Sequence, residues 1–406
     1  MHTSHLPGSA PALVPPSRRH TVELLAALLI AACTAPPTTD EAHPPDVLRA
    51  EFVRDAFLFV HGTVAGHPAT MLLDTGAGRT FVSAAFAERI GLRGDAGKSG
   101  SAVGVSGTVP ATLVDDVPIE LGRNRTAMTV VVLPIDVEPM LGRELQVVLG
   151  RNVFTDFVVE MDYANERVTL HDRESFRYQG PGTTLPLQRG ELDAWSVAVD
   201  IEDLGPAWFD LDTGDSGTLT LHAPYVSEHR LLDGRPRGTA MGVGVGGIHE
   251  AVSTRLARVG LGGTVFRDVP VYTHESEAGV FARTRAAGNL GAELLCRFRL
   301  IVDGWRQQIH LEPNAERVGE PFTRNRSGLA LAHRGSHLEV MHVVAGSPAA
   351  AAGFAVGDRI RTIDGKDVAI GYWDGAWRWV QQPQGTAVTI ELVDGTRRTF
   401  TFGEVP

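Results

Sequence analysis

The sequence predicts a mainly β protein, with two similar β lobes in the middle of the chain and a small α/β domain after them. Three observations support this fold class. Glycine provides 45 of the 406 residues, and short runs of Val, Thr and Leu alternate with Gly, Asp and Pro, which is typical of many strands and turns. A set of landmark residues occurs twice between about residues 57 and 311. From about residue 322 the texture of the sequence changes, which indicates a further domain.

Composition and charge narrow the functional classes. The apolar fraction of 43% is enough to build cores. A formal net charge of −11 argues against a nucleic-acid surface and against a basic membrane-binding face. The histidines are scattered, without an H-E-x-x-H motif or a Cys/His cluster, so we expect neither a metal site nor a cofactor.

The first 33 residues have the pattern of a signal peptide. Two basic residues, Arg18 and Arg19, precede the apolar run from Leu24 to Ala32, which is too short to span a bilayer. The run ends in Ile-Ala-Ala-Cys, which resembles the lipobox of bacterial lipoproteins, so Cys33 is the expected lipidation site. An ordinary secretory signal with an incidental cysteine is the alternative. Residues 34–50, rich in Pro, Thr and Ala, are predicted to be a tether. We therefore expect an exported, lipid-anchored protein, in the periplasm or at the surface of a bacterium.

The internal repeat is built on two Asp-Thr-Gly triplets, at Asp74 and Asp212. A glycine of a Gly-rich segment follows each aspartate by 30 positions (104 − 74 and 242 − 212). The glycine of a Leu-Gly pair follows by 76 and 79 positions (150 − 74 and 291 − 212). From those glycines an aspartate follows by 12 positions in both copies (162 − 150 and 303 − 291). A shared register over more than a hundred residues predicts two similar lobes, 51–178 and 186–314.

Each lobe is expected to hold four parts: an Asp-Thr-Gly loop, a Gly-rich hairpin, an apolar strand ending in Leu-Gly, and a closing hairpin. The closing hairpins are "VVEMDYANERVTLHD" and "LIVDGWRQQIHLEP". Alternating apolar and polar residues in "ERVTLHD" and "RQQIHLEP" indicate half-buried strands.

Two aspartates held close together have a specific chemistry. Both cannot ionise comfortably, so they share one proton, and one pKa rises while the other falls. The ionised carboxylate can then draw a proton from a water while its protonated partner supports the carbonyl under attack. Asp74 and Asp212 are the candidates. Tight turns at Gly76 and Gly214 would keep the two loops rigid.

With these motifs in place, residues 55–314 resemble a single-chain, two-lobed aspartic protease of the retropepsin/pepsin type. The resemblance implies that Asp74 and Asp212 are the catalytic pair, with no covalent intermediate. It implies that the active-site loops are supported by Thr75, Gly76, Ala77, Thr213, Gly214, Asp215 and Ser216, the two threonines bonding across the join. It also implies substrate-binding flaps at Gly104, Val105, Ser106, Gly107, Gly242, Val243 and Gly244. The segments "VVLGRN" and "NLGAEL" would pack beneath the loops.

Asp215 departs from the family pattern, which usually has Ala, Ser or Thr three residues after the aspartate. Ala77 fits this pattern. An ionised Asp215 beside the pair would raise the apparent pKa values of the pair, or Asp215 would itself stay protonated. The alternative is an outward-pointing Asp215 paired with an arginine. The first arrangement predicts an enzyme tuned towards milder acid than a digestive protease.

The stretch Gly-Asp-Ser-Gly, at Gly214 to Gly217, also allows a serine protease in which Ser216 is the nucleophile. That mechanism needs a histidine and an aspartate upstream. The candidate His61 lies in a predicted strand without a catalytic-histidine context, and the first lobe repeats Asp-Thr-Gly but not Gly-Asp-Ser-Gly. The serine alternative is the weaker one.

Residues 322–405 resemble a bacterial PDZ domain. The resemblance rests on Gly346-Ser347-Pro348-Ala349, on the segment Val356 to Ile360, and on the turn Asp364-Gly365-Lys366. It implies that Gly328, Leu329, Ala330 and Leu331 form a loop whose N–H groups bind a terminal carboxylate of a peptide. A module that only docks on the lobes is the alternative. Helical spacing places Trp373, Ala376, Trp377 and Val380 in the core, whereas Trp379 falls off that face.

The function predicted from these features is that of an aspartic endopeptidase whose PDZ domain recruits substrate or regulates access. Its expected partners are a peptide or protein substrate and a PDZ ligand with a free C-terminus, with no nucleic acid. The rival from another class is a non-catalytic peptide-binding lipoprotein that kept the protease fold.

Overall fold

The computed structural model describes residues 44–405, with gaps at 95–97, 105–106, 275–279 and 369–376. The predicted signal peptide, Cys33 and most of the tether lie outside the described residues. Within the described part, no helix has the length and apolarity needed to cross a membrane.

The predicted β class is confirmed, because strands dominate every described segment. The helices are single turns or little more, so tertiary packing must hold them. Their bounds are α1 (Ala84–Arg89), α2 (Glu138–Leu141), α3 (Arg151–Asp156), α4 (Ala223–Glu228), α5 (Ala292–Leu295), α6 (Pro348–Ala351), η2 (Glu191–Asp193), η3 (Val280–Ala282) and η4 (Trp377–Gln381).

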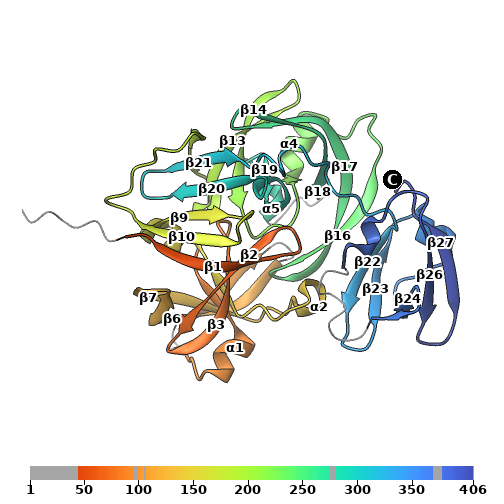
Figure 1. The fold of residues 1–406 in the computed structure, drawn as a ribbon, viewed down its shortest axis with the longest axis horizontal. Coiled ribbons are helices and arrows are strands. Elements are labelled where there is room, and N and C mark those ends of the chain that lie inside the picture. The colour runs from red at the N-terminus through yellow and green to blue at the C-terminus, as the bar shows by residue number, and fades with distance from the viewer. Residues whose placement is uncertain (1–43, 95–97, 105–106, 275–279, 369–376, 406) are drawn as a thin grey trace, which may run out of the picture. The chain divides into compact units, whose positions relative to one another are not determined.

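The largest sheet has thirteen described strands in the order β11-β21-β20-β9-β10-β1-β2-β3-β8-β4-β7-β6-β5 (Figure 1). Most of its strands come from residues 46–172, which we call the first half. Their bounds are β1 (Asp46–Val53), β2 (Phe57–Val64), β3 (His67–Leu73), β4 (Phe81–Ser83), β5 (Ser99–Gly104), β6 (Gly107–Leu121), β7 (Asn124–Leu133), β8 (Val147–Leu149), β9 (Phe157–Asp162) and β10 (Arg167–Asp172).

Residues 183–313, which we call the second half, form an eight-stranded sheet in the order β12-β13-β14-β19-β15-β18-β17-β16 and give three strands to the larger sheet. The bounds are β11 (Thr183–Pro186), β12 (Gln188–Arg189), β13 (Trp195–Ile201), β14 (Gly205–Asp212), β15 (Leu219–Leu221), β16 (Gly238–Gly244), β17 (Gly247–Leu261), β18 (Thr264–Thr273), β19 (Gly288–Gly291), β20 (Phe298–Asp303) and β21 (Gln308–Pro313).

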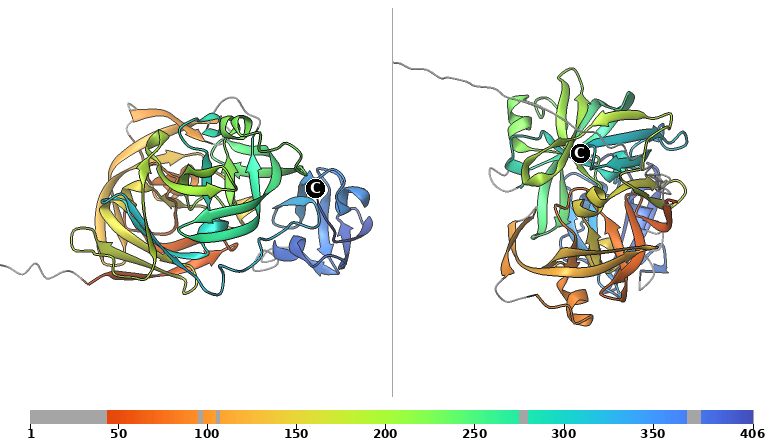
Figure 2. Two further views of the ribbon diagram at one scale, coloured as in Figure 1. Left: turned by 90° about the horizontal axis from the view of Figure 1, so that it is seen from above. Right: turned by 90° about the vertical axis from the view of Figure 1, so that its left-hand side faces the viewer.

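The two halves share a sheet and a core. Strand β9 of the first half pairs antiparallel with β20 of the second half, so the two closing hairpins lie side by side in one sheet. One continuous apolar cluster contains side chains from both halves, including Phe154, Trp195 and Phe298. Figure 2 shows the long strands β6 and β17, 15 residues each, as curved ribbons from two further sides.

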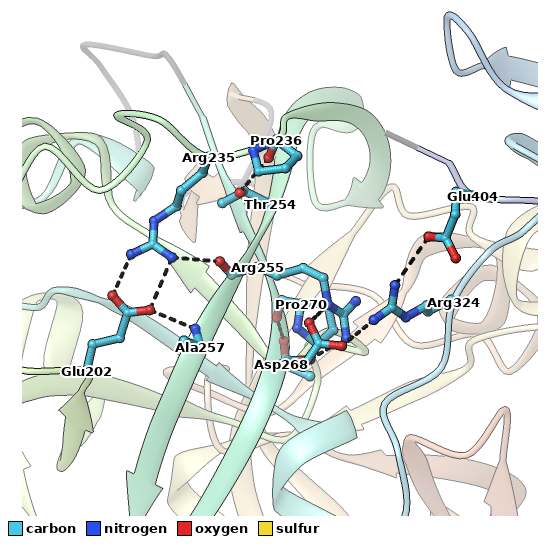
Figure 3. Close-up of polar contacts among 11 residues, drawn as sticks. Glu202, Arg235, Pro236, Thr254, Arg255, Ala257, Asp268, Pro270, Arg324 and Glu404 are labelled. Carbon is cyan, nitrogen blue, oxygen red and sulfur yellow. Dashed lines mark hydrogen bonds and ion pairs between the residues drawn. The ribbon is translucent and has the colours of Figure 1, made fainter.

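Polar contacts hold the base of the β16–β17 hairpin in place (Figure 3). Arg235, just before β16, donates to both carboxylate oxygens of Glu202, at 3.1 and 2.5 Å. One of its nitrogens also donates to the carbonyl of Arg255 on β17, at 2.9 Å. The Ala257 N–H donates to Glu202 at 2.7 Å, which ties the same strand to the β13–β14 turn. The base of this hairpin is therefore hydrogen-bonded both to the β13–β14 turn and to Arg235.

The C-terminal sheet is separate and has its own apolar core. Its strands are β22 (Leu329–His333), β23 (Leu338–Val343), β24 (Arg359–Ile363), β25 (Lys366–Asp367), β26 (Ala387–Leu392) and β27 (Arg397–Thr401). The predicted core residues Trp373 and Ala376 lie outside the described residues. Trp379 is buried in this core, although its spacing had placed it off the buried face.

Two predicted boundaries shift. Strand β1 begins at Asp46, which pairs with Leu170, so the last five residues of the predicted tether (46–50) belong to the sheet. Phe322, predicted to open the C-terminal domain, packs in the core of the two halves instead, edge-on to Phe266 and beneath the guanidinium of Arg297. Neither boundary could be predicted from the sequence, because both depend on contacts with residues far away in the chain.

Candidate active site

The two Asp-Thr-Gly triplets leave the ends of β3 and β14. Each of these strands pairs in parallel with the strand that ends in Leu-Gly: β3 with β8 and β14 with β19. The Asp74 N–H donates to the carbonyl of Leu149 at 3.0 Å, which fixes the start of the first loop. The segments predicted to lie beneath the loops are therefore their immediate neighbours.

Thr75 and Thr213 join the two loops. The hydroxyl of Thr75 donates to the carbonyl of Leu211 at 2.8 Å, and the hydroxyl of Thr213 donates to the carbonyl of Leu73 at 3.0 Å. In return, each hydroxyl accepts the backbone N–H of the other threonine, at 3.1 and 3.0 Å. Both side chains are buried. Four buried hydrogen bonds thus hold two loops that are 138 residues apart in the chain.

Gly76 and Gly214 allow the two aspartates to approach. A Cβ on Gly76 would lie 2.5 Å from the carboxyl carbon of Asp212, and a Cβ on Gly214 would lie 2.4 Å from the carboxyl carbon of Asp74. No side chain fits in that space. Each glycine is therefore required by the carboxyl group of the opposite loop.

Asp74 and Asp212 form a hydrogen-bonded carboxyl pair. One oxygen of Asp74 accepts the N–H groups of Gly76 and Ala77, at 2.8 and 3.1 Å. One oxygen of Asp212 accepts only the N–H of Gly214, at 3.1 Å. Burial raises the pKa of both carboxyls. The charge of Asp215 raises both pKa values as well, and the pKa of Asp212 is raised further because the charge of Asp74 acts on it. The pair can therefore hold one proton, and that proton is more stable on Asp212 than on Asp74.

Asp215 turns inward, which the sequence left open. One of its oxygens accepts the Gly217 N–H at 2.8 Å, and the other accepts the Thr220 hydroxyl at 2.9 Å. No arginine pairs with it among the described residues, so the outward-pointing alternative is wrong. Burial raises the pKa of Asp215, while these two hydrogen bonds lower it in part. The carboxyl of Asp215 is thus close enough for its charge to act on Asp74 and Asp212.

The two sides of the pair differ in chemistry. Beside Asp74, the buried side chains of Phe59, Leu72 and Val148 form an apolar cluster, against which Ala77 packs. Beside Asp212, the side-chain nitrogen of Asn289 donates to the free carboxyl oxygen at 2.9 Å.

Further polar groups continue from Asn289 on this side. Asp210 is buried, accepts the Ser196 hydroxyl at 2.6 Å and pairs with Arg283 at 2.9 Å. His222 is fully buried and lies next to Asn289. Neither Asn289 nor His222 was predicted from the sequence. The available signal was the polar residue two before the glycine in "GNLG", where the first copy has valine.

The structure shows no histidine partner for Ser216 among the described residues. Its side chain is exposed, and among the described residues no histidine hydrogen-bonds to it. His61 is mid-strand in β2, as expected, and its ring contacts Glu51 at 2.5 Å. The geometry therefore offers no support for the serine alternative.

The predicted flap residues belong to the hairpins β5–β6 and β16–β17. Gly104 pairs with Gly107 across the first hairpin, and Gly244 pairs with Gly247 across the second. Val105 and Ser106 lie outside the described residues. The hairpin ends meet, since a Cβ on Gly104 would lie 2.2 Å from the carbonyl oxygen of Val245.

The predicted carboxylate loop, Gly328 to Leu331, begins β22, which is an edge strand of the C-terminal sheet. Gly328 has a φ of 79°, which favours glycine. Its N–H donates to the side chain of Asn325 at 3.0 Å, and the Leu329 N–H donates to Ser327 at 3.0 Å. Both N–H groups are therefore already bonded, and a carboxylate would have to displace these side chains.

The carboxyl pair should cost folding stability at neutral pH. A carboxyl whose pKa is raised by folding binds its proton more tightly in the folded state. The contribution of such a carboxyl to stability is greatest at low pH and is lost as the pH rises through its folded pKa. We expect Asp212→Asn to raise the Tm at pH 7 by about 3 °C or more, since one pKa unit is worth about 1.4 kcal/mol. The gain should shrink at pH 4. Calorimetry at both pH values checks this, with the exposed Asp203→Asn as control; a lower Tm for Asp212→Asn at pH 7 would contradict it.

Comparison with known families gives two matches. Residues 60–153, which include Asp74, match the family described as aspartyl protease. Residues 339–394 match the family described as PDZ domain. No curated protein matches the chain. The chain thus carries an aspartyl protease domain followed by a C-terminal PDZ domain.

Proposed function

We propose that the protein is an aspartic endopeptidase in which Asp74 and Asp212 together activate a water molecule. The observation that carries this proposal is the cross-bonded pair of Asp-Thr-Gly loops, which brings two carboxyl groups into hydrogen-bond contact. The aspartyl protease match covers only the first triplet, at residues 60–153. Asp212, in the second triplet, is included because its loop is hydrogen-bonded to the first loop.

The proposal includes a bilobal origin for the catalytic unit. What supports it is the strand order around each triplet: β2-β3-β8-β4-β7-β6-β5 in the first half and β13-β14-β19-β15-β18-β17-β16 in the second. The parallel and antiparallel pairings also agree, with β3–β8 and β14–β19 both parallel. On this account the two triplets meet at a pseudo-twofold axis between the lobes 51–178 and 186–314.

The roles of the two aspartates differ in the proposed reaction. Asp74 is the ionised partner, because two backbone N–H groups stabilise its charge. It takes a proton from the water that attacks the peptide carbonyl. Asp212 is the protonated partner and donates a hydrogen bond to the carbonyl oxygen, where negative charge develops. The tetrahedral intermediate collapses when the leaving nitrogen receives a proton from the pair, and the peptide bond breaks without a covalent enzyme intermediate.

Asp215 should extend activity towards milder acid. Its charge raises the pKa of Asp212, and the reaction needs Asp212 protonated. We expect Asp215→Asn to move the high-pH limb of kcat/KM down by about one pH unit. The pH–rate profile measures this, with Asp203→Asn as the exposed control. An unchanged high-pH limb in Asp215→Asn, or a parent optimum at strongly acidic pH, would contradict the role of Asp215.

The accessory parts complete the proposal. The PDZ domain would bind peptides with a free C-terminus at β22 and so recruit substrate or regulate access to the pair. The N-terminal segment would export the chain and anchor it through Cys33, in the periplasm or at the surface of a bacterium.

The proposed activity is tested on the full chain without its signal peptide. A denatured protein substrate is incubated with it from pH 3 to 8, and fragments are identified by mass spectrometry. We expect internal cleavage that a pepstatin-type inhibitor stops and that Ser216→Ala leaves unchanged. Absence of cleavage at every pH would favour the non-catalytic peptide-binding protein. Loss of cleavage in Ser216→Ala would favour the serine mechanism.

A further inference from the structure

Asn289 lies between Asp212 and a buried histidine. Its side-chain nitrogen is 2.9 Å from one carboxyl oxygen of Asp212. Its other neighbour is His222, the N-cap residue of α4, whose exposed fraction is 0%. The His222 Nδ1 is 2.9 Å from the carbonyl oxygen of Ala286. The side chains of Asp212, Asn289 and His222 are thus successive neighbours. The series ends at the Ala286 carbonyl, just before β19.

The protonation of His222 follows from its backbone contact. A carbonyl oxygen only accepts hydrogen bonds, so Nδ1 must carry the hydrogen. Burial and the charge of Arg283 lower the pKa of His222 to about 4. Above that pH the ring is neutral. Its other nitrogen, Nε2, is then a bare lone pair that can only accept a hydrogen bond.

Two buried atoms along this series are without a partner. With the amide nitrogen towards Asp212, Asn289 Oδ1 and His222 Nε2 each lack a hydrogen bond among the described residues, although the two side chains are neighbours. Two acceptors cannot satisfy one another, and leaving both unpaired is costly. Exchanging the oxygen and nitrogen of the Asn289 amide resolves the conflict, because the two orientations have the same shape. The amide nitrogen then donates to Nε2 of His222.

The exchanged amide also fixes the proton of Asp212. Asn289 Oδ1 now occupies the position 2.9 Å from the Asp212 oxygen that the nitrogen had occupied. Two oxygens at hydrogen-bond distance need a hydrogen between them, and an amide oxygen has none to give. The hydrogen therefore belongs to Asp212, which donates it to Asn289 Oδ1 in the free protein and turns it to the carbonyl oxygen of a bound substrate.

We propose that Asn289 and His222 are positioning residues that form a hydrogen-bond relay from the Ala286 carbonyl to Asp212 and keep the proton of the pair on Asp212. The inference rests on the proposed function, since it assigns the acid of that reaction. It also explains why the two sides of the pair differ. Two residues before the Leu-Gly glycine, the first half has Val148, and at the N-cap of α1 it has Ser83, so Asp74 has no such relay.

Other charged groups face the relay and set its pH range. Asp74 and Asp215 act on Asp212, and both raise its pKa. Arg283 and Glu191 act on His222 in opposite directions. Arg283 also pairs with Asp210, which moderates its effect on the ring. Below about pH 4 a protonated His222 would donate from Nε2 and turn the amide back, so the relay operates above that value.

The first test is the pH dependence of kcat/KM in three variants of the full chain. His222→Leu and Asn289→Leu remove the relay, so we expect the high-pH limb to move down by about one pH unit in both. His222→Gln keeps an acceptor where Nε2 was, so its limb should stay with that of the parent. A fall in kcat without movement of the limb, or a His222→Gln limb displaced like that of His222→Leu, would show a structural role only and overturn the proposal.

The second test does not depend on catalysis. Nitrogen NMR of the chain labelled with ¹⁵N-histidine distinguishes the tautomers of a ring, and the resonances lost in His222→Leu identify this residue. We expect a neutral ring at pH 6 with the hydrogen on Nδ1 and a hydrogen-bonded, unprotonated Nε2. A hydrogen on Nε2 at pH 6 would overturn the relay. If the parent shows no cleavage, the proposed function fails while this measurement still decides the relay.

Discussion

Asp74→Asn and Asp212→Asn should each abolish peptide cleavage, with kcat/KM falling by about 10³-fold or more. The two carboxyls share one proton, and the proposed reaction uses one as base and the other as acid. An amide can neither take a proton from water nor give one to the substrate carbonyl. The side chains are similar in shape, and a neutral group relieves a buried pair of carboxyls, so both variants should remain folded.

The measurement is the rate of cleavage of an unfolded protein at the pH optimum of the parent. Ser216→Ala is the matched control, because Ser216 lies in the same loop and is exposed. Retention of more than a few per cent of the activity in either asparagine variant would show that the pair is not the catalytic unit.

Gly214→Ala should lower the cleavage rate about 100-fold, a smaller loss than that of either aspartate. The added Cβ would lie 2.4 Å from the carboxyl carbon of Asp74, and real Cβ atoms do not approach that closely. The loop must shift, and the two threonines that join the loops allow little movement without breaking their four hydrogen bonds. A displacement of about 1 Å between reacting groups is enough to lower a rate about 100-fold.

Gly100→Ala is the control for this substitution. Gly100 lies in β5 of the first Gly-rich hairpin, and a Cβ there would meet nothing within 4 Å. We expect it to retain activity and thermal stability. Cleavage rates and thermal melts of both variants check the comparison. A fully active Gly214→Ala would contradict the close approach of the two loops.

Much of this site could be predicted from the sequence because the internal repeat carries it. The spacing of Asp74 and Asp212 from their Gly-rich and Leu-Gly partners is a matter of counting, and the structure places the Leu-Gly strands next to the loops. The inward direction of Asp215 could not be counted in this way. It depends on the Thr220 hydroxyl and the Gly217 N–H, which are local contacts that other side-chain rotamers would break.

The residues that the sequence did not reveal break the repeat. Asn289 stands where the first copy has valine, and His222 stands where it has serine, so a search for matching positions passes over both. The pairing of β9 with β20 was also hidden, because an alternating strand pattern does not say which strand lies beside it. Phe322 lies near a domain boundary, and only packing against Phe266 and Arg297 assigns it to a core.

The central claim is that Asp74 and Asp212 act as one unit. A double-mutant cycle tests it most directly, with kcat/KM measured for the parent, Asp74→Asn, Asp212→Asn and the double variant under the same conditions. Because either substitution already removes the shared-proton chemistry, the account predicts that the double variant is no slower than the slower single variant. Losses that multiply in the double variant, or one single variant that keeps parental activity, would contradict it.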